Sequence, residues 1–181
     1  MHMSEELELE LTYLVKSLPD GLAACESEDV LDIYVPKSAV HPTLRIRKSG
    51  GKTVITKKEP KDGGDSSEQV ENTIPLTAGE YEDLSKIEGK RVRKTRYRYN
   101  YNGRIAEIAV FQDGLKGLVL VDFEFKDRKS KQAFKMPEFC LANVTHEMFL
   151  AGGMLCGKRY GDIEGELAKF SYRKLDTASL L

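Results

Sequence analysis

The sequence predicts an α+β protein whose main element is an antiparallel sheet that closes, or nearly closes, on itself. Charged and apolar residues alternate in segment after segment, most clearly at 7–11 (Leu-Glu-Leu-Glu-Leu), 44–47 (Leu-Arg-Ile-Arg) and 121–125 (Val-Asp-Phe-Glu-Phe). Tight-turn sequences at 49–52 (Ser-Gly-Gly-Lys) and 100–103 (Asn-Tyr-Asn-Gly) join such segments. Because successive side chains of a strand point to opposite faces, each segment is expected to present one apolar face and one charged face.

The alternating segments give the expected strands in order. Short antiparallel strands joined by tight turns are typical of a meander that closes into a barrel. The polar stretch 61–67 is expected to be a loop inside one hairpin. We therefore expect one domain over residues 1–181, with a core at about 6–155. The eight expected strands cover about 6–15, 30–35, 43–48, 52–58, 68–75, 92–101, 104–111 and 117–126.

Helices are expected in the gaps between the strands. Pro19 is tolerated in a first turn and predicts a helix to about residue 28. Thr77 and Glu80 form a capping box for a helix near 78–88, which Gly89 would end. Thr145 is expected to cap a further helix. The remaining expected helices cover 129–135, 146–155 and, at the C-terminus, 162–174.

The composition excludes several classes of protein. Charged residues make up 31% of the 181 residues and hydrophobic residues 40%, which is typical of a globular chain. No apolar run is long enough to cross a bilayer, and the acidic start is unlike a secretory signal, so a cytoplasmic location is expected. The net charge of −1 disfavours a generic polyanion binder. The three cysteines and three histidines are isolated and predict neither zinc nor a disulfide framework.

The apolar stripes of the helices also need a partner. The economical arrangement places the helices outside the sheet, against its apolar face, so that the charged face lines an interior groove or tunnel. The alternative, in which the charged face is solvated, is common for antiparallel sheets.

A charged interior has to balance its charges, because desolvation and like-charge repulsion are both unfavourable. Clustered carboxylates favour Mg²⁺ or Mn²⁺, and guanidinium or ammonium groups suit phosphate oxygens. Metal ions bridging carboxylates and phosphate are the usual apparatus of phosphoryl transfer. The candidate acids are Glu8, Glu10, Glu107, Asp122 and Glu124, and the candidate bases are Arg45, Arg47, Lys58, Lys94 and Arg96.

The chain resembles the CYTH superfamily, or triphosphate tunnel metalloenzymes, and most closely its small bacterial members. The motifs that carry the resemblance run in order from about residue 6 to about 155. They are 8–10 (Glu-Leu-Glu), 44–47 (Leu-Arg-Ile-Arg), 55–58 (Ile-Thr-Lys-Lys), 94–98 (Lys-Thr-Arg-Tyr-Arg), 107–108 (Glu-Ile), 117–120 (Gly-Leu-Val-Leu) and 122–125 (Asp-Phe-Glu-Phe).

The resemblance implies an eight-stranded antiparallel tunnel with a charged interior and helices packed outside. It implies that the five acids named above are ligands for one or two Mg²⁺ or Mn²⁺ ions. Glu8, Glu10 and Glu124 would be catalytic through the metal they hold. It also implies that the five bases hold the phosphates of a small phosphorylated ligand, a triphosphate or nucleotide, which family members hydrolyse or, in some cases, cyclise to cyclic AMP.

The sequence departs from the family pattern at four positions. Thr12 stands where the signature has lysine, and Gln69 where an arginine is frequent. Thr73 replaces a glutamate and Ala109 an aspartate. Each change removes a charge from the expected interior, and one lost electrostatic contact can slow catalysis by roughly two to three orders of magnitude.

Three functions therefore stand as alternatives. The first is divalent-metal-dependent hydrolysis of a triphosphate, with adenylate-cyclase-type cyclisation of ATP as a variant. The second is a binding module that holds a phosphorylated ligand without cleaving it. The third, nucleic-acid binding through the basic, tyrosine-rich stretch 91–104, is disfavoured because alternation puts its tyrosines and its basic residues on opposite faces. A membrane partner is not expected. The oligomeric state is left open, with a homodimer as one alternative.

Overall fold

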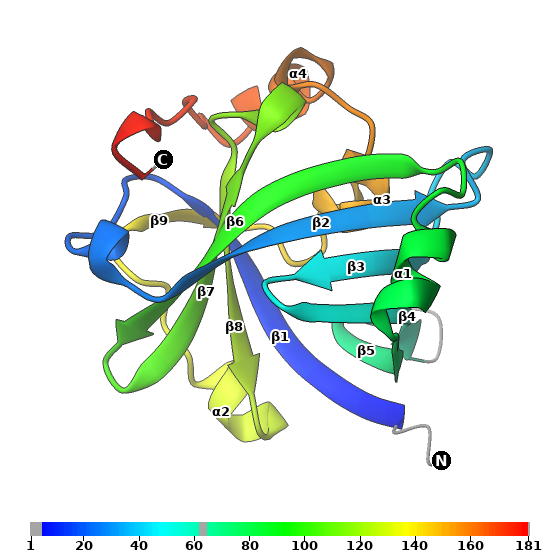
Figure 1. Ribbon diagram of the computed structural model, residues 1–181. Helices are drawn as coiled ribbons and strands as arrows, with labels where there is room; N and C mark the ends of the chain where they lie inside the picture. Colours follow the sequence, from blue (N-terminus) through cyan, green and yellow to red (C-terminus); the bar gives the residue numbers. More distant parts are fainter. Residues whose placement is uncertain (1–4, 62–64, 181) are drawn as a thin grey trace.

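A computed structural model describes residues 5–61 and 65–180, with side chains for 8–60 and 67–180. Eight antiparallel strands close into a barrel, as the alternation predicted (Figure 1). The expected loop at 61–67 is shorter than predicted, since strands reach to 61 and begin again at 65, while 62–64 lie outside the described residues. The strands are β1 (Glu5–Val15), β2 (Ser27–Val35), β3 (Leu44–Ser49), β4 (Lys52–Lys61), β5 (Asp65–Pro75), β6 (Lys90–Tyr101), β7 (Arg104–Phe111) and β8 (Val119–Phe125).

The barrel is built from two meanders rather than one. Strands β2 to β5 form the first and β6 to β8 the second, and β2 pairs with β6 between them. Strand β1 closes the barrel by pairing with β5 on one side and with β8 on the other. Each pairing along the ring is antiparallel, so the side chains of one face of every strand point into the same interior.

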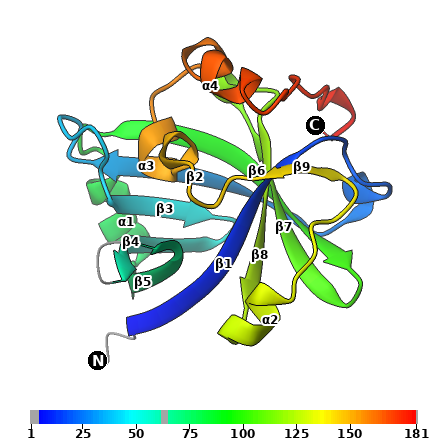
Figure 2. The same ribbon diagram turned by 180° about the vertical axis from the view of Figure 1, so that it is seen from behind.

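A ninth strand, β9 (Cys140–Asn143), was not expected from the sequence. It pairs with the end of β1, where Tyr13 lies opposite Asn143 (Figure 2). Its four residues are too few to show an alternating pattern, which is why the sequence gives no signal for it.

Two of the expected helices are confirmed in shortened form. Helix α1 (Ala78–Leu84) begins at the predicted capping box, in which the Thr77 hydroxyl accepts from the Glu80 amide, and it ends before Gly89. Helix α2 (Arg128–Gln132) is capped by Asp127. Within residues 5–61 and 65–180, no helix has the length and apolar character that crossing a membrane requires.

The other three expected helices are wrong in extent. The region 19–28 holds one short 3₁₀ turn, η1 (Leu22–Ala24), because β2 extends its pairing with β6 back to Ser27. The region 146–155 is divided into η3 (Met148–Leu150) and α3 (Gly152–Leu155), and Thr145 bonds Asn143 instead of capping a helix. The C-terminal helix shrinks to α4 (Glu164–Ala168), and the chain reverses at Ser171, where φ is 57°. Three further 3₁₀ turns are η2 (Asp113–Leu115), η4 (Tyr160–Asp162) and η5 (Ala178–Leu180).

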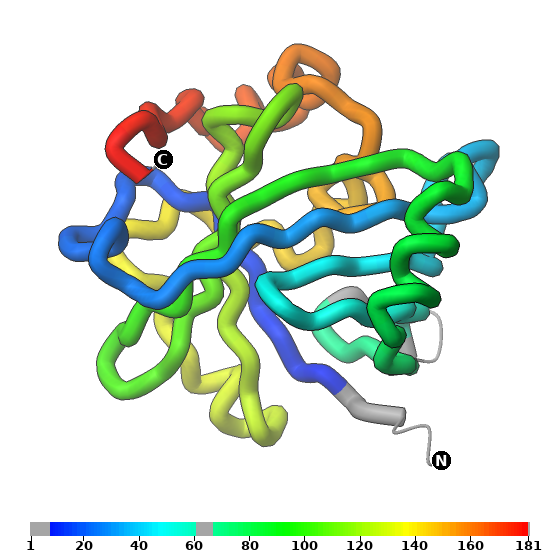
Figure 3. Tube along the Cα trace, viewed as in Figure 1, coloured from blue at the N-terminus to red at the C-terminus, as the bar shows by residue number. Residues whose placement is uncertain are grey.

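The apolar residues form two separate clusters. One lies on the outside of β1, β7 and β8, where Phe123 packs under Phe134 of the segment that follows α2, with the ring centroids 4.6 Å apart. The other fills one end of the barrel, where Leu14 and Leu120 continue the inward faces of their strands and meet the C-terminal segment. The tube view shows this segment running over that end (Figure 3). The barrel interior is therefore apolar at one end and charged in the remainder.

We expect Tyr172→Phe to destabilise the protein by about 1–3 kcal/mol, because it leaves buried polar groups unpaired. The buried Tyr172 hydroxyl accepts from the Val119 amide and donates to the Gly117 carbonyl, both at 2.9 Å, and so ties the C-terminal segment to β8. Urea unfolding measures the change, with Tyr81→Phe on α1 as the control. Equal shifts in the two variants would contradict this role.

Candidate active site

A cavity of about 360 Å³ occupies the charged part of the barrel and is lined by all eight strands. It brings together every acid and every base that the sequence singled out. The reason is the strand periodicity: these residues occupy alternate positions, and the closed sheet turns all of those positions inward. The predicted residues that line it are Glu8, Glu10, Arg45, Arg47, Lys58, Lys94, Arg96, Glu107, Asp122 and Glu124.

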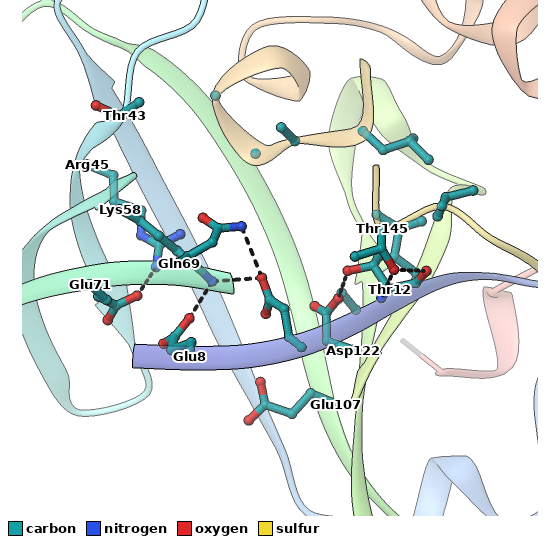
Figure 4. A pocket seen from close by; sticks show the side chains of 18 of the residues that line it. Glu8, Thr12, Thr43, Arg45, Lys58, Gln69, Glu71, Glu107, Asp122 and Thr145 are labelled. Carbon is teal, nitrogen blue, oxygen red and sulfur yellow. Dashed lines mark hydrogen bonds and ion pairs between the residues drawn. The ribbon is translucent and has the colours of Figure 1, made fainter. Parts of the chain in front are cut away.

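Lys58 of β4 lies between the two acids of β1 (Figure 4). Its Nζ is 2.5 Å from a Glu8 oxygen and 2.9 Å from a Glu10 oxygen. Burial alone would lower the pKa of Lys58, but the two carboxylates outweigh it and raise that pKa above its usual value. Gln69 of β5 also donates to Glu10, at 3.4 Å. Lys58 is therefore a fixed cation between the two candidate metal ligands of β1.

Arg45 of β3 has a buried nitrogen with no partner among the described residues. Its Nη2 donates to Glu71 at 3.4 Å, and its side chain is 15% exposed. Its Nε has no hydrogen-bond partner. Leaving a buried donor unpaired is unfavourable, so this atom favours a bound acceptor. Burial lowers the pKa of Arg45, but Tyr34, Asp32 and Glu71 outweigh it, so the guanidinium stays charged.

Arg47 of β3 is paired to a residue that sequence reasoning missed. Asp32 of β2 lies directly opposite it in the sheet and accepts from its Nε at 2.6 Å and from its Nη2 at 2.8 Å. Burial acts to raise the pKa of Asp32, but the Arg47 charge and hydrogen bonds outweigh it and lower that pKa to about 2. The alternation of Asp32 with Leu31 and Ile33 was a usable signal, since it is the pattern of the other inward charges.

The two cations of β6 differ in their surroundings. Arg96 is paired with Glu107 of β7, at 3.1 Å. Lys94 lies deeper, with its Nζ 5.5 Å from the centre of the Phe111 ring. Burial, and then repulsion from Arg96 and Arg47, lower the pKa of Lys94 to about 7. Near neutral pH, the protonation of Lys94 therefore depends on the charge of the ligand that enters the cavity.

Asp122 and Glu124, the acids of β8, lie on the opposite side of the barrel from Arg45 and Arg47 of β3. Asp122 accepts from the Thr12 hydroxyl at 2.6 Å, and the Thr12 amide donates to Thr145 at 3.0 Å (Figure 4). Glu124 is exposed. Desolvation and then the charges of Glu107, Glu8 and Glu10 raise the pKa of Glu124.

The four departures from the family pattern occupy the interior as expected. Thr12 and Gln69 each donate to a carboxylate, where a cation would otherwise stand. Thr73 donates to Glu71 at 2.7 Å. Ala109 is 3% exposed and lies in the apolar cluster at the filled end of the barrel. Alanine in place of aspartate at position 109 therefore extends the apolar end of the barrel interior.

Helix α3 approaches the cavity lining so closely that only glycine fits. A Cβ on Gly152 would lie 2.2 Å from the Tyr34 hydroxyl, and one on Gly153 would lie 2.2 Å from the Pro42 carbonyl oxygen. Both glycines line the cavity. The Gly-Gly pair, which weakens the helix, thus allows α3 to cover this side of the site.

The donor set suits a hard divalent cation. The cavity presents several carboxylates and no cysteine among its described lining residues, and its one sulfur there is the thioether of Met148. Burial, Asp122 and Glu8 raise the pKa of Glu10 against the opposing effect of Lys58, so these acids are incompletely compensated. Among the described residues, no three aspartate, glutamate, histidine or cysteine side chains form a group that could hold a metal ion without rearrangement. Lys58 supplies the positive charge between Glu8 and Glu10 instead.

Comparisons with known proteins agree with this geometry. No family model matches the chain. The inorganic triphosphatase of Nitrosomonas europaea is 32% identical over 142 residues, which cover 77% of this chain and 90% of that protein. A crystal structure of an inorganic triphosphatase superposes with a TM-score of 0.61 at 27% identity, covering 87% of this chain and 98% of that one.

A further solved structure supports the fold alone. A Bacillus halodurans protein, 16% identical, superposes with a TM-score of 0.55 over 97% of this chain and 95% of that one. The closed eight-stranded barrel, the inward acids and bases, and the relative of more than 30% identity agree with one another. The chain belongs to the CYTH superfamily, the triphosphate tunnel metalloenzymes.

Proposed function

We propose that this protein hydrolyses a triphosphate inside its barrel with the help of a divalent cation, and that inorganic tripolyphosphate is its substrate. The Nitrosomonas europaea relative, an inorganic triphosphatase, supports the reaction and the substrate. The observation that carries the proposal is the set of five bases and five acids that face one cavity. Mg²⁺ or Mn²⁺ is the proposed metal, because carboxylates are their preferred ligands.

The bases of β3 and β6 would hold the phosphate chain. Arg45, with its unpaired Nε, and Arg47 lie on one strand, and Lys94 and Arg96 on another, so oxygens of neighbouring phosphates can meet donors from both. These donors would also stabilise the negative charge that develops on the phosphate oxygens during cleavage.

The acids would hold the metal. Glu8, Glu10 and Glu124 are the proposed ligands, with Asp122 and Glu107 nearby, and all five line the cavity. A divalent cation held by these acids would neutralise phosphate charge and activate a water. The raised pKa values of Glu10 and Glu124 are consistent with acids that lack a full complement of positive charge.

A binding module without turnover is the second candidate. The observation that favours it is the loss of interior charge at Thr12, Gln69 and Ala109, which the structure fills with hydrogen bonds or apolar packing. Two assays, each with Mg²⁺ and with Mn²⁺, separate hydrolysis, cyclisation and binding alone. One measures phosphate release from tripolyphosphate and from ATP, and the other measures cyclic AMP formation from ATP. Tight binding without any product would favour the module.

We expect Lys58→Met to reduce phosphate release from tripolyphosphate by about two to three orders of magnitude, since it removes a cation from the site. The matched control is Lys57→Met on the same strand. Lys57 points the other way, is 51% exposed and pairs with Glu59 at 3.1 Å. A malachite green assay with each metal and with EDTA measures the rates. Equal rates for the two variants would count against the site.

We expect binding of metal-free tripolyphosphate at pH 8 to be accompanied by proton uptake at Lys94. With a pKa of about 7, this lysine is mostly neutral at pH 8 in the free protein, and the arriving negative charge raises its pKa. At pH 5.5 it is already protonated, so the uptake disappears. Calorimetry in buffers of different ionisation enthalpy measures the protons, and Lys94→Met should lack this contribution. Uptake unchanged in Lys94→Met would refute the assignment.

We expect Thr12→Lys to lower the KM for tripolyphosphate, because it adds a cation beside Asp122 inside the cavity. The same change at Gln132, which is exposed on α2 outside the barrel, serves as the control for added charge. Steady-state kinetics at several salt concentrations give the measurement. A KM that is unchanged or higher would show that the lysine of the family signature does not limit this protein.

A further inference from the structure

Asp32 is a buried acid that belongs to neither the proposed metal ligands nor the proposed phosphate ligands. It is 1% exposed, in the middle of β2. Three cations act on its carboxylate, those of Arg47, Arg45 and Lys94. A buried carboxylate persists only when it is paired, and here the pairing is made with a residue that lines the cavity.

The contact between Asp32 and Arg47 fixes the orientation of the guanidinium. Two nearly parallel hydrogen bonds, of 2.6 Å and 2.8 Å, join the Nε and Nη2 edge of Arg47 to the two carboxylate oxygens. This bidentate geometry allows one plane and one direction for the guanidinium. The Arg47 side chain is 12% exposed, so little other freedom remains to it. The Nη1 group and one Nη2 hydrogen are left to serve a ligand.

Arg45 provides a contrast on the same strand. Its hydrogen bond to Glu71 is a single one of 3.4 Å, and its Nε has no partner among the described residues. Arg45 thus keeps more of its donors for a ligand, whereas the Nε and Nη2 edge of Arg47 is already bound to Asp32. The two arginines are therefore prepared for different tasks.

We propose that Asp32 is a positioning residue, which holds the Arg47 guanidinium so that its Nη1 edge meets one phosphate of the substrate. This inference rests on the proposed function. Asp32 does not touch the substrate; it acts through Arg47. A held donor favours the transition state because it needs no reorganisation while charge develops on the phosphate.

Asp32→Asn keeps the shape of the side chain and disrupts the bidentate contact. The amide nitrogen opposes an N–H of Arg47, so the guanidinium has to turn. We expect kcat for tripolyphosphate to fall about ten- to a hundred-fold. KM should not rise, because removing the negative carboxylate does not reduce the positive charge near the phosphates. Asp29→Asn is the matched control on the same strand, where Asp29 is 65% exposed and lies 3.7 Å from Arg93.

A double-mutant cycle separates positioning from a general structural role. If Asp32 acts through Arg47, then Asp32→Asn should change kcat by less than about two-fold in an Arg47→Met background. A similar loss of kcat in both backgrounds would overturn the proposal. So would a variant that melts at a lower temperature but keeps the wild-type kcat per folded molecule.

A measurement on the wild type covers the case in which Asp32→Asn does not fold. In ¹⁵N-labelled protein, the Arg47 Nε–H should exchange with water at least about ten-fold more slowly than the Nε–H of Arg93, which is 50% exposed. The protection should persist when metal-free tripolyphosphate is added. Exchange as fast as that of Arg93, or loss of protection with tripolyphosphate, would overturn the proposal.

The same measurement distinguishes two failures. If the wild type releases no phosphate, the proposed hydrolysis fails and the kinetic comparison falls away. The exchange experiment needs binding but no turnover, so it still decides whether Asp32 holds Arg47 while the phosphates are bound.

Discussion

The interior of this barrel depends on the compensation of charges that the closed sheet forces together. Because every strand turns one face inward, acids from β1, β7 and β8 and bases from β3, β4 and β6 share one cavity. Their desolvation would be prohibitive if they were unpaired. Ion pairs meet much of this requirement: Lys58 with Glu8 and with Glu10, Asp32 with Arg47, Arg96 with Glu107, and Arg45 with Glu71.

The strands were predictable because a period of two residues survives in the sequence wherever one face is charged. All eight expected strands exist, and each of their ends agrees with the prediction to within three residues. The helices were less predictable because tertiary packing decided them. The expected helix at 19–28 does not form because β2 pairs with β6 from Ser27 onward. The C-terminal segment follows the filled end of the barrel, where Ile163 and Leu167 are buried. Apolar spacing fixed what is buried there but not the backbone conformation.

The candidate site was predictable as a set of side chains but not as a set of pairs. Alternation predicts that Lys58 and Arg47 face inward, yet which acid each one meets depends on the register between strands distant in sequence. Asp32 was overlooked because apolar residues stand on both faces of its strand around it, at Val30, Leu31, Ile33 and Tyr34. The apolar filling of one end of the barrel, by Leu14 and Leu120 among others, was also not expected, since it depends on the C-terminal segment covering that end.

Two departures from the family pattern, Thr12 and Gln69, remove positive charge from the cavity, and the other two, Thr73 and Ala109, remove negative charge. Thr12 and Gln69 donate hydrogen bonds to Asp122 and Glu10 without adding positive charge. Among the described lining residues, seven carboxylates face five bases. Lys94, with its pKa of about 7, is only partly charged near neutral pH. A highly charged polyphosphate therefore meets a cavity of net negative charge, and a divalent cation bound at the acids would reverse much of that repulsion. Metal and phosphate are thus expected to bind cooperatively, each raising the affinity for the other.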